Sequence, residues 1–296
     1  MTVTAIRKRP AQARRGAART RRLVERRPGP LIYTAMALLV TASLFPLYWT
    51  FVVASSDNTV IGQATPPLVP GGHLLENFSR VFDSVDFWLA LKNSVIISTT
   101  TAVSNVVFST MAGFAFAKLR FKGRGILLGT VVATVMVPTQ LGIVPLYMMI
   151  TEMGLYASVS AVILPALVSA FGVFWMRQAI DENIPDELIE AARVDGCRLI
   201  GVWWHIVLPG VRSTAAVLAM FVFMTAWNDF FWPLVVLPPG TGGTVQTVLS
   251  QLASGYFTDY SLIMSGAFLG ILPLLVLFVV FARQIVSGVM AGAVKG

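Results

Sequence analysis

Charged residues are scarce in this sequence. Asp, Glu, Lys and Arg make up 12% of its 296 residues and hydrophobic residues make up 56%, whereas soluble domains carry about 25% charged residues. This composition excludes an ordinary cytoplasmic enzyme. The length alone would suggest about two soluble domains, but the long uncharged runs described below predict a single membrane-embedded bundle.

Cysteine and histidine are almost absent. Cys197 is the only cysteine, so an internal disulfide is excluded, and His73 and His205 are too widely separated to form a ligand pair. The sequence also lacks the Gly-x-x-x-x-Gly-Lys-Ser/Thr loop that binds ATP phosphates. We therefore expect no catalytic residue, metal or cofactor in this chain, and any ATP-Mg that drives it must lie in a partner ATPase.

The positive charge is confined to one end. The formal net charge is +8, but residues 1–30 hold ten basic residues against one acid, Glu25, and the rest is nearly neutral. Thr20-Arg21-Arg22-Leu23 is similar to a twin-arginine export signal, and a cleaved signal peptide is an alternative. The following uncharged run, residues 31–56, exceeds a usual signal core of about 7–15 residues. We therefore expect an uncleaved cytoplasmic tail that touches anionic lipid and binds no nucleic acid.

Six segments are long and apolar enough to cross a membrane, which takes about 20 residues in a helix. They are 31–56, 93–117, 125–151, 153–176, Ser213–Val236 (a stretch interrupted only by Asp229) and 260–282. Their apolar residues run continuously and do not alternate, which favours helices over the strands of a barrel. The predicted fold class is all-α, a polytopic membrane helical bundle with six transmembrane helices.

The distribution of Lys and Arg predicts the orientation, because cytoplasmic loops carry the excess of these residues. With the N-terminal tail inside, only Arg80 and Lys92 fall outside. Both termini are then cytoplasmic, in a bacterial or archaeal plasma membrane. The chain divides into a basic tail, 1–30, and a transmembrane domain, 31–296, whose cytoplasmic loop covers about 183–212.

Two predicted outer segments have helical patterns of their own. The second half of 57–92 has the spacing of an amphipathic helix at the outer interface. Residues 237–258 open with Pro238-Pro239-Gly240 and continue with Val245, Val248, Leu249 and Leu252 at helical spacing. This second segment either dips into a cavity or meets an outside partner.

The predicted cytoplasmic loop has the pattern of two helices joined at a glycine. Pro185 suits a first helical position, and Gly196 suits the left-handed residue after a helix end. Leu188, Ala191, Ala192 and Asp195 share one face of the first helix. The second helix repeats this spacing up to Leu208-Pro209, and Trp203 and Trp204 predict that it lies along the membrane interface. We expect an elbow outside the bilayer.

The elbow and several spans carry a family resemblance. The motif positions are Glu190-Ala191-Ala192, Gly196, Ile206 and Leu208-Pro209, and they match the "EAA" loop of binding-protein-dependent ABC import permeases. Ala112–Phe121, Trp227–Leu234 and the terminal Gly292–Gly296 also resemble the carbohydrate-uptake members of this family. Within it, the chain most resembles the second, six-span permease of maltose-type systems. The basic tail departs from the pattern.

The resemblance implies partners and residue roles. It implies a heterodimer with a second permease subunit, two cytoplasmic ATPase subunits and an extracytoplasmic solute-binding protein that delivers a sugar. Glu190 would pair with a basic residue of the ATPase, Ala191 and Ala192 would pack closely there, and Gly196 would form the elbow. The outer loop 237–258 would reach the binding protein, and the C-terminal tail would approach the ATPase dimer.

Two residue-level alternatives stay open. On a helix, Glu190 is also spaced to pair with Arg193, an interaction of about 0.2–0.5 kcal/mol. Asn228 and Asp229 lie within a predicted span, where polar groups are costly. They lie on the transport path, serve helix packing or hold an outer-interface position.

We therefore expect ATP binding in the partner to move the docked elbow as a lever on the fifth span and to switch the bundle between two states. The strongest rival is an ABC import permease for a non-sugar solute, such as a phosphate ester or polyamine. A secondary transporter is less favoured, because only Asp229 offers an intramembrane coupling acid.

Overall fold

The computed structural model describes residues 29–60, 67–255 and 258–293. The basic tail predicted for residues 1–30 thus lies almost entirely outside the described residues, as do the last three residues of the chain. Within the described ranges, all regular secondary structure is helical. The predicted all-α class is confirmed to this extent.

Three helices are long, and the others are short or form bent pairs. The long ones are α2 (Pro30–Ala54), α4 (Phe87–Lys118) and α15 (Tyr260–Ala293). The remaining α-helices are α3 (Leu74–Ser84), α5 (Arg124–Val135), α6 (Ile143–Glu152), α7 (Val159–Ile163), α8 (Ala170–Asn183), α9 (Asp186–Val194), α10 (Leu199–Val202), α11 (Leu208–Gly210), α12 (Arg212–Trp227), α13 (Phe231–Val236) and α14 (Val245–Leu252). Short 3-10 turns lie at Asn58–Val60, Thr139–Gly142 and Leu164–Ala166, and a π turn lies at Trp203–Val207.

Between three and six membrane spans are compatible with these helices. The three long helices are each apolar enough to span, and three bent pairs reach the required length only together. The pairs join α5 to α6 at 95°, α7 to α8 at 43° and the α10–α11 segment to α12 at 83°. The six-span count therefore stays a prediction, and the predicted spans 125–151 and 153–176 each fall on two helices with a bend between them.

Proline explains one of the breaks. Backbone hydrogen bonds after α5 end with the amide of Val137, which donates to Thr134, and resume at Leu141, which donates to Pro138. Pro138 has no amide hydrogen, so it cannot continue the helical ladder across this point. The chain turns there, near the centre of the uncharged run between Arg124 and Glu152.

The described residues fall into two units, the first ending at Trp49 and the second beginning at Thr50. Within the first unit, residues 30–49 form an apolar stretch of helix that contains Pro46.

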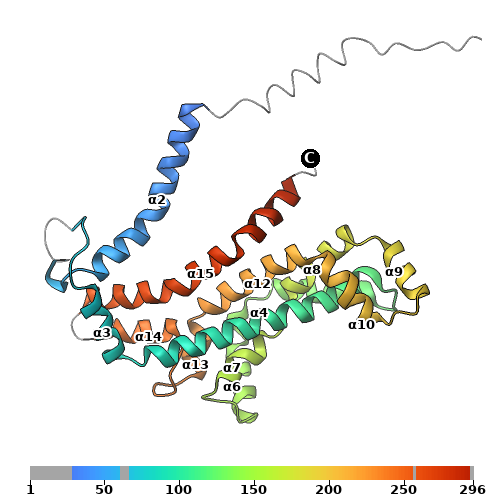
Figure 1. Cartoon of the computed structure of the whole chain (residues 1–296). Helices are drawn as coiled ribbons and strands as arrows, with labels where there is room; N and C mark the ends of the chain where they lie inside the picture. The colour runs from blue at the N-terminus through green and yellow to red at the C-terminus, as the bar shows by residue number, and fades with distance from the viewer. Residues whose placement is uncertain (1–28, 61–66, 256–257, 294–296) are drawn as a thin grey trace, which may run out of the picture. The chain divides into compact units, whose positions relative to one another are not determined.

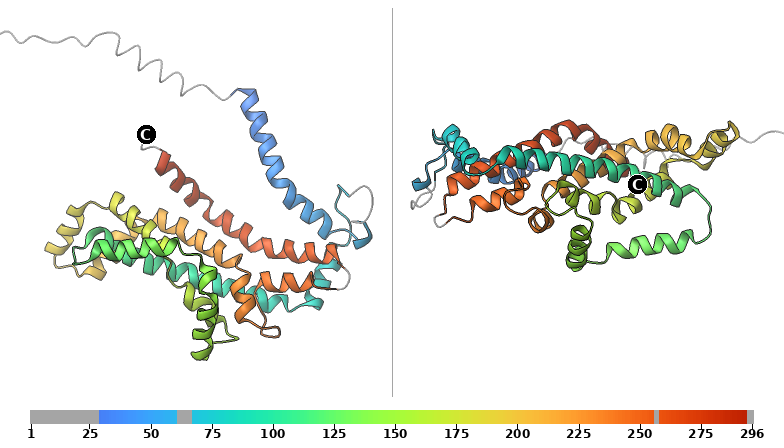
Figure 2. Two further views of the ribbon diagram at one scale, coloured as in Figure 1. Left: turned by 180° about the vertical axis from the view of Figure 1, so that it is seen from behind. Right: turned by 90° about the horizontal axis from the view of Figure 1, so that it is seen from below.

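In the second unit, α4 packs against both α8 and α12, and Figures 1 and 2 show these helices side by side. The contact with α8 is close at Gly113, where an added Cβ atom would lie 2.8 Å from the backbone nitrogen of Arg177 and 2.9 Å from the carbonyl carbon of Met176. Only a glycine permits the two backbones to approach in this way. Figure 1 shows α9 and α10 beyond one end of α4, and α3 and α14 at the other end.

Buried apolar side chains form one cluster at each end of α4. The first cluster joins α4, α8 and α12 to the α9–α11 segment and includes Met176, Ile180, Val202, Trp203 and Leu218. The second cluster joins α3, α4, α12, α14 and α15 and includes Val81, Phe87, Trp227 and Val245. Residues 74–84 and 245–252 do form the helices expected of the two outer segments, and both pack into the second cluster.

The Gly113 contact can be tested by substitution. Gly113→Ala places a methyl group against backbone atoms, which cannot rotate away, so we expect a loss of about 1–3 kcal/mol in stability, as for an overpacked core. Thermal unfolding of the detergent-solubilised protein measures this loss. Gly129→Ala on α5 is the matched control, because no atom lies within 4 Å of its added methyl group. Equal melting temperatures for the two variants would contradict the packing described here.

Candidate functional site

The segment from residue 183 to residue 212 folds as two helices, and we call it the elbow. Its first helix, α9, begins at Asp186, with Pro185 at the N-cap. The expectation that Pro185 occupies the first helical position is therefore wrong by one residue. Asp186 and Glu187 lie in the first turn and Arg193 lies in the last, which suits the positive start and negative end of the helix dipole.

Gly196 forms the corner between the two helices, as predicted. Its φ is +79°, in the left-handed region that favours glycine because it has no Cβ atom. The amides of Gly196 and Cys197 close the helix end by donating to the carbonyls of Arg193 (3.1 Å) and Ala192 (2.9 Å). No atom lies within 4 Å of an added Cβ at this position, so the requirement for glycine comes from the backbone angle and not from crowding.

The second helix of the elbow runs without interruption from Leu199 to Gly210 through a π turn. Pro209 cannot donate a backbone hydrogen bond, and the helix widens just before it. Val202 and Trp203 point into the core, and the indole Nε1 of Trp203 donates to Thr110 Oγ1 on α4 at 3.1 Å. Trp204 is exposed. Trp203 therefore serves to hold this helix to the bundle, and the position of the helix along the membrane interface stays a prediction.

An ion pair holds the start of α9 to the end of α4. Lys118 Nζ lies 2.7 Å from Asp186 Oδ1, and the lysine side chain is only 7% exposed. The hydrogen bond from Lys118, and the positive charges of Lys118, Arg120 and Arg124, lower the pKa of the Asp186 carboxyl below its usual value. Because the folded-state pKa is depressed, the stability that this pair contributes is lost only as the pH falls through that low value.

The motif residues of the elbow divide into an outward and an inward group. Those exposed to solvent are Glu190, Ala191, Asp195, Gly196 and Pro209; those packed at least partly against the first apolar cluster are Ala192, Ile206 and Leu208. Ala192 thus serves to seat α9 on its own chain, whereas Ala191 leaves room for the approach of another surface.

Glu190 has no ion-pair partner within the described residues. The alternative pairing with Arg193 is therefore not formed in this structure, and the carboxylate projects from the elbow into solvent. Next to it, Leu188 is 50% exposed and Val194 is 88% exposed. Large apolar side chains exposed beside a free charge are typical of a surface that meets a partner.

Asn228 and Asp229 lie together at the break between α12 and α13. Asn228 ends α12, where its Nδ2 donates to the carbonyl of Met224 at 2.8 Å, and its Oδ1 lies 3.5 Å from Gln246 Nε2. The half-buried carboxylate of Asp229 faces the amides of Phe231 and Trp232 at the start of α13. Asp229 thus faces amides freed at the start of α13, whereas the carbonyl of Met224 also accepts from the backbone amide of Asn228. A role on the transport path stays a prediction.

Several residues that hold the site have no local signal in the sequence. In the sequence, Lys118 is only one of the positive charges that predict the cytoplasmic side. Its partner, Asp186, lies 68 residues away. Thr110 is one of several small polar residues in its predicted span, and nothing in the sequence indicates that it binds Trp203. The exposed Val194, in contrast, could have been recognised from the sequence, because it is an apolar residue at the polar end of a short helix.

The fold and the exposed elbow define a polytopic membrane permease of the transport class. Residues 105–289 match the family model described as "Binding-protein-dependent transport system inner membrane component". The chain belongs to this family. It is therefore a multi-pass membrane protein and a transport component, and not an enzyme.

Relatives match over nearly the whole chain. The chain is 35% identical over 273 residues to the lactose transport system permease protein of Rhizobium radiobacter, covering 92% of this chain and 98% of the relative. It is 32% identical to the arabinooligosaccharides transport system permease protein of Halalkalibacterium halodurans, covering 90% and 96%. It is also 32% identical to the sn-glycerol-3-phosphate transport system permease protein of Yersinia pestis, covering 90% and 99%.

A solved structure has the same fold. A bacterial ABC transporter involved in the import of the acidic polysaccharide alginate matches with a TM-score of 0.73 at 19% identity, covering 86% of this chain and 94% of that chain.

The corner at Gly196 gives a direct test of the elbow. Gly196→Val forces a β-branched side chain into a left-handed conformation, at a cost of about 1–2 kcal/mol, so we expect faster proteolytic cleavage within residues 183–212. Limited proteolysis of the purified protein measures the rate. Gly196→Asn is the matched control, because asparagine tolerates this conformation. Equal cleavage of the valine variant and the parent would show that the corner does not depend on the left-handed residue.

Proposed function

We propose that this chain is the transmembrane permease subunit of an ATP-driven ABC importer for a sugar or oligosaccharide delivered by an extracytoplasmic solute-binding protein. The observation that carries the proposal is the exposed elbow, whose Glu190 and Ala191 project outward from a firmly packed base. Family membership supplies the transport class. The lactose and arabinooligosaccharide permeases among the relatives favour a carbohydrate as the solute.

The proposed topology has six spans with both termini in the cytoplasm. Its support is the positive-inside pattern, together with three long helices and two bent pairs, α5 with α6 and α7 with α8, that can each supply one span. The sixth span is the predicted Ser213–Val236, which α12 and α13 cover. This topology puts the elbow in the cytoplasm, where an ATPase can reach it. It puts the loop between α13 and α14, residues 237–244, on the outer side, where a solute-binding protein can reach it.

The proposed partners are a second permease subunit in a heterodimer and two ATPase subunits that hold ATP-Mg. The break after α5 supports a second membrane subunit. Met136 is 84% exposed and Leu141 is 74% exposed on either side of it, and α5 is only about 18 Å long at 1.5 Å per residue, so the break falls within a hydrocarbon core of about 30 Å. Broken backbone at that depth requires protein or water around it, and the described part of the second unit does not cover it.

In the proposed mechanism, the ATPase subunits grip the elbow and move it when they close on ATP. The elbow transmits the movement as a unit, because its inward residues belong to the same apolar cluster as α4, α8 and α12. ATP binding then favours one of two arrangements of the bundle, and alternation between them exposes the solute path first to one side and then to the other.

A second candidate function has a specific observation in its favour. The sn-glycerol-3-phosphate permease of Yersinia pestis is as similar to this chain as the arabinooligosaccharide permease is, so a phosphorylated polyol is an alternative solute within the same mechanism. A secondary transporter has less support, because the side chain of Asp229 faces backbone amides of its own helix break.

The docking role of Glu190 predicts a charge-reversal effect. In the complex with its ATPase, Glu190→Lys should abolish solute-stimulated ATP hydrolysis, because the variant lysine meets a basic partner. The bundle should stay folded, because Glu190 has no ion-pair partner within the described residues of its own chain. ATP hydrolysis by the reconstituted complex measures this. Glu152→Lys, an exposed acid at the end of α6, is the matched control. Undiminished stimulation in the Glu190 variant would refute docking through this residue.

Uptake into proteoliposomes tests the function itself. With the second permease, the ATPase and the binding protein from the same gene cluster, we expect lactose or an arabinooligosaccharide to accumulate only with internal ATP and the binding protein. Glycerol-3-phosphate uptake in their place would favour the second candidate function. Uptake driven by a proton gradient without ATP would exclude an ABC importer.

A further inference from the structure

Helix α4 is the long unbroken helix of the second unit. It runs for 32 residues without a proline, whereas α15 contains Pro273 and the other candidate spans of this unit are bent pairs. At 1.5 Å per residue it is about 48 Å long, longer than the hydrocarbon core of about 30 Å. A displacement at one end of such a helix reaches the other end without loss at a hinge.

The first end of α4 holds the loop that precedes α14. Asn93 Nδ2 donates to the carbonyl of Gly243 at 2.9 Å, and the amide of Val245 donates to Ser94 Oγ at 2.9 Å. Both α4 side chains are at least 95% buried. Gly242 has a φ of +87°, and an added Cβ atom there would collide with the side chain of Leu89 on α4. The loop is thus fitted to this end of the helix.

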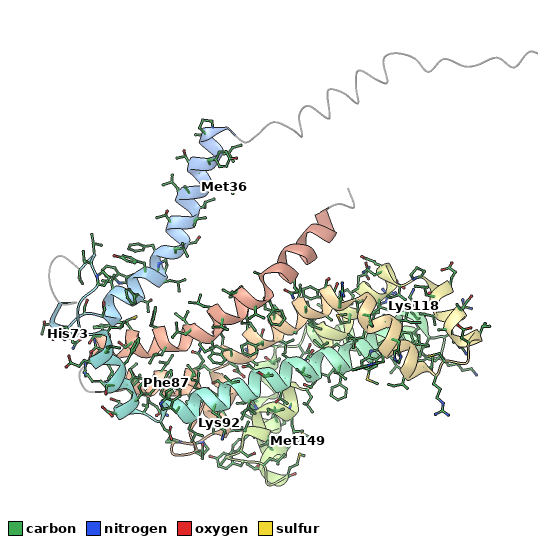
Figure 3. All side chains as sticks on the ribbon, viewed as in Figure 1. Met36, His73, Phe87, Lys92, Lys118 and Met149 are labelled. Atoms are coloured by element: carbon green, nitrogen blue, oxygen red, sulfur yellow. The ribbon has the colours of Figure 1, made fainter. Side chains whose placement is uncertain are left out.

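The second end of α4 holds both helices of the elbow. Lys118 pairs with Asp186 at the start of α9, and Thr110 accepts the hydrogen bond from Trp203 in the second elbow helix. Figure 3 shows Phe87 and Lys92 near the first end of α4 and Lys118 at the second. Along α4, Thr110 lies 16 residues after Ser94 and Lys118 lies 25 residues after Asn93, about 24 and 38 Å at 1.5 Å per residue.

The middle of α4 is attached to its neighbours through Asn105. Its Nδ2 donates to the carbonyl of Ala166 at 3.3 Å, and its Oδ1 accepts from Ser169 Oγ at 3.0 Å. The hydroxyls of Ser98 and Thr101 are buried without a hydrogen-bond partner in the described residues. At these two positions α4 is held by packing alone, so no hydrogen bond from either side chain opposes a movement.

We propose that α4 is a rigid relay between the α13–α14 loop and the elbow, with Asn93 and Ser94 as positioning residues at its outer end and Lys118 at its inner end. This inference rests on the proposed function, in which the loop meets the solute-binding protein and the elbow meets the ATPase. Arrival of the loaded binding protein at the loop moves α4 through Asn93 and Ser94. The elbow follows through Lys118 and brings the ATPase subunits toward closure.

The test uses the complete reconstituted transporter and compares ATP hydrolysis with and without solute-loaded binding protein. Asn93→Ala and Lys118→Met should each reduce the stimulation at least about fivefold, the factor that corresponds to a coupling free energy of roughly 1 kcal/mol. Complex yield and unstimulated hydrolysis should stay unchanged. The double variant should lose no more stimulation than the more affected single variant, because both changes interrupt one path. Lys118→Arg should restore the stimulation, since it keeps the charge. Thr99→Ala, on an exposed face of α4, is the matched control.

Three results would overturn the relay: full stimulation in both single variants, losses that multiply in the double variant, or equal losses of yield and stimulation. If Asn93→Ala does not assemble, Ser94→Ala replaces it, because that change removes a single acceptor. Failure of the proposed function gives a different result, in which the binding protein fails to stimulate the parent complex at all.

Discussion

The close contact between α4 and α8 at Gly113 determines where the functional parts of this molecule lie. With no side chain at this residue, the backbone of Met176 and Arg177 lies directly against α4. Helix α8 leads within a few residues into the elbow, and α4 ends beside it. Because the two helices cannot separate or slide here without losing this contact, the elbow has a fixed base from which Glu190 and Ala191 project.

The elbow motif combines two physical tasks in one short sequence. Ala192, Ile206 and Leu208 pack inward and join the elbow to the bundle, while Glu190, Ala191 and the corner at Gly196 are exposed. A helix of nine residues is marginal by itself in water, so the inward residues supply the stability that the outward ones cannot. The motif that the sequence predicts as one docking surface therefore contains two sets of residues: an exposed set and a partly buried set that holds it in place.

Much of the fold could be predicted because it depends on local patterns. Apolar runs predicted the long helices, and Pro185 and Gly196 marked the ends of α9 within one residue. The bends could not be predicted in the same way, since a proline such as Pro138 only permits a break and its angle depends on the packing of both halves. Pairings such as Lys118 with Asp186 depend on the approach of segments 68 residues apart, which no local pattern encodes.

Two of the breaks within the membrane segments differ in how their freed backbone groups are satisfied. At the α12–α13 break, the carboxylate of Asp229 faces the amides of Phe231 and Trp232. At the break after α5, Met136 and Leu141 are apolar and exposed, so their side chains cannot bind freed backbone groups. In the proposed topology both breaks lie at membrane depth, where backbone must be covered by protein or water. This difference between the two breaks is the physical reason for proposing a second membrane subunit beside α5.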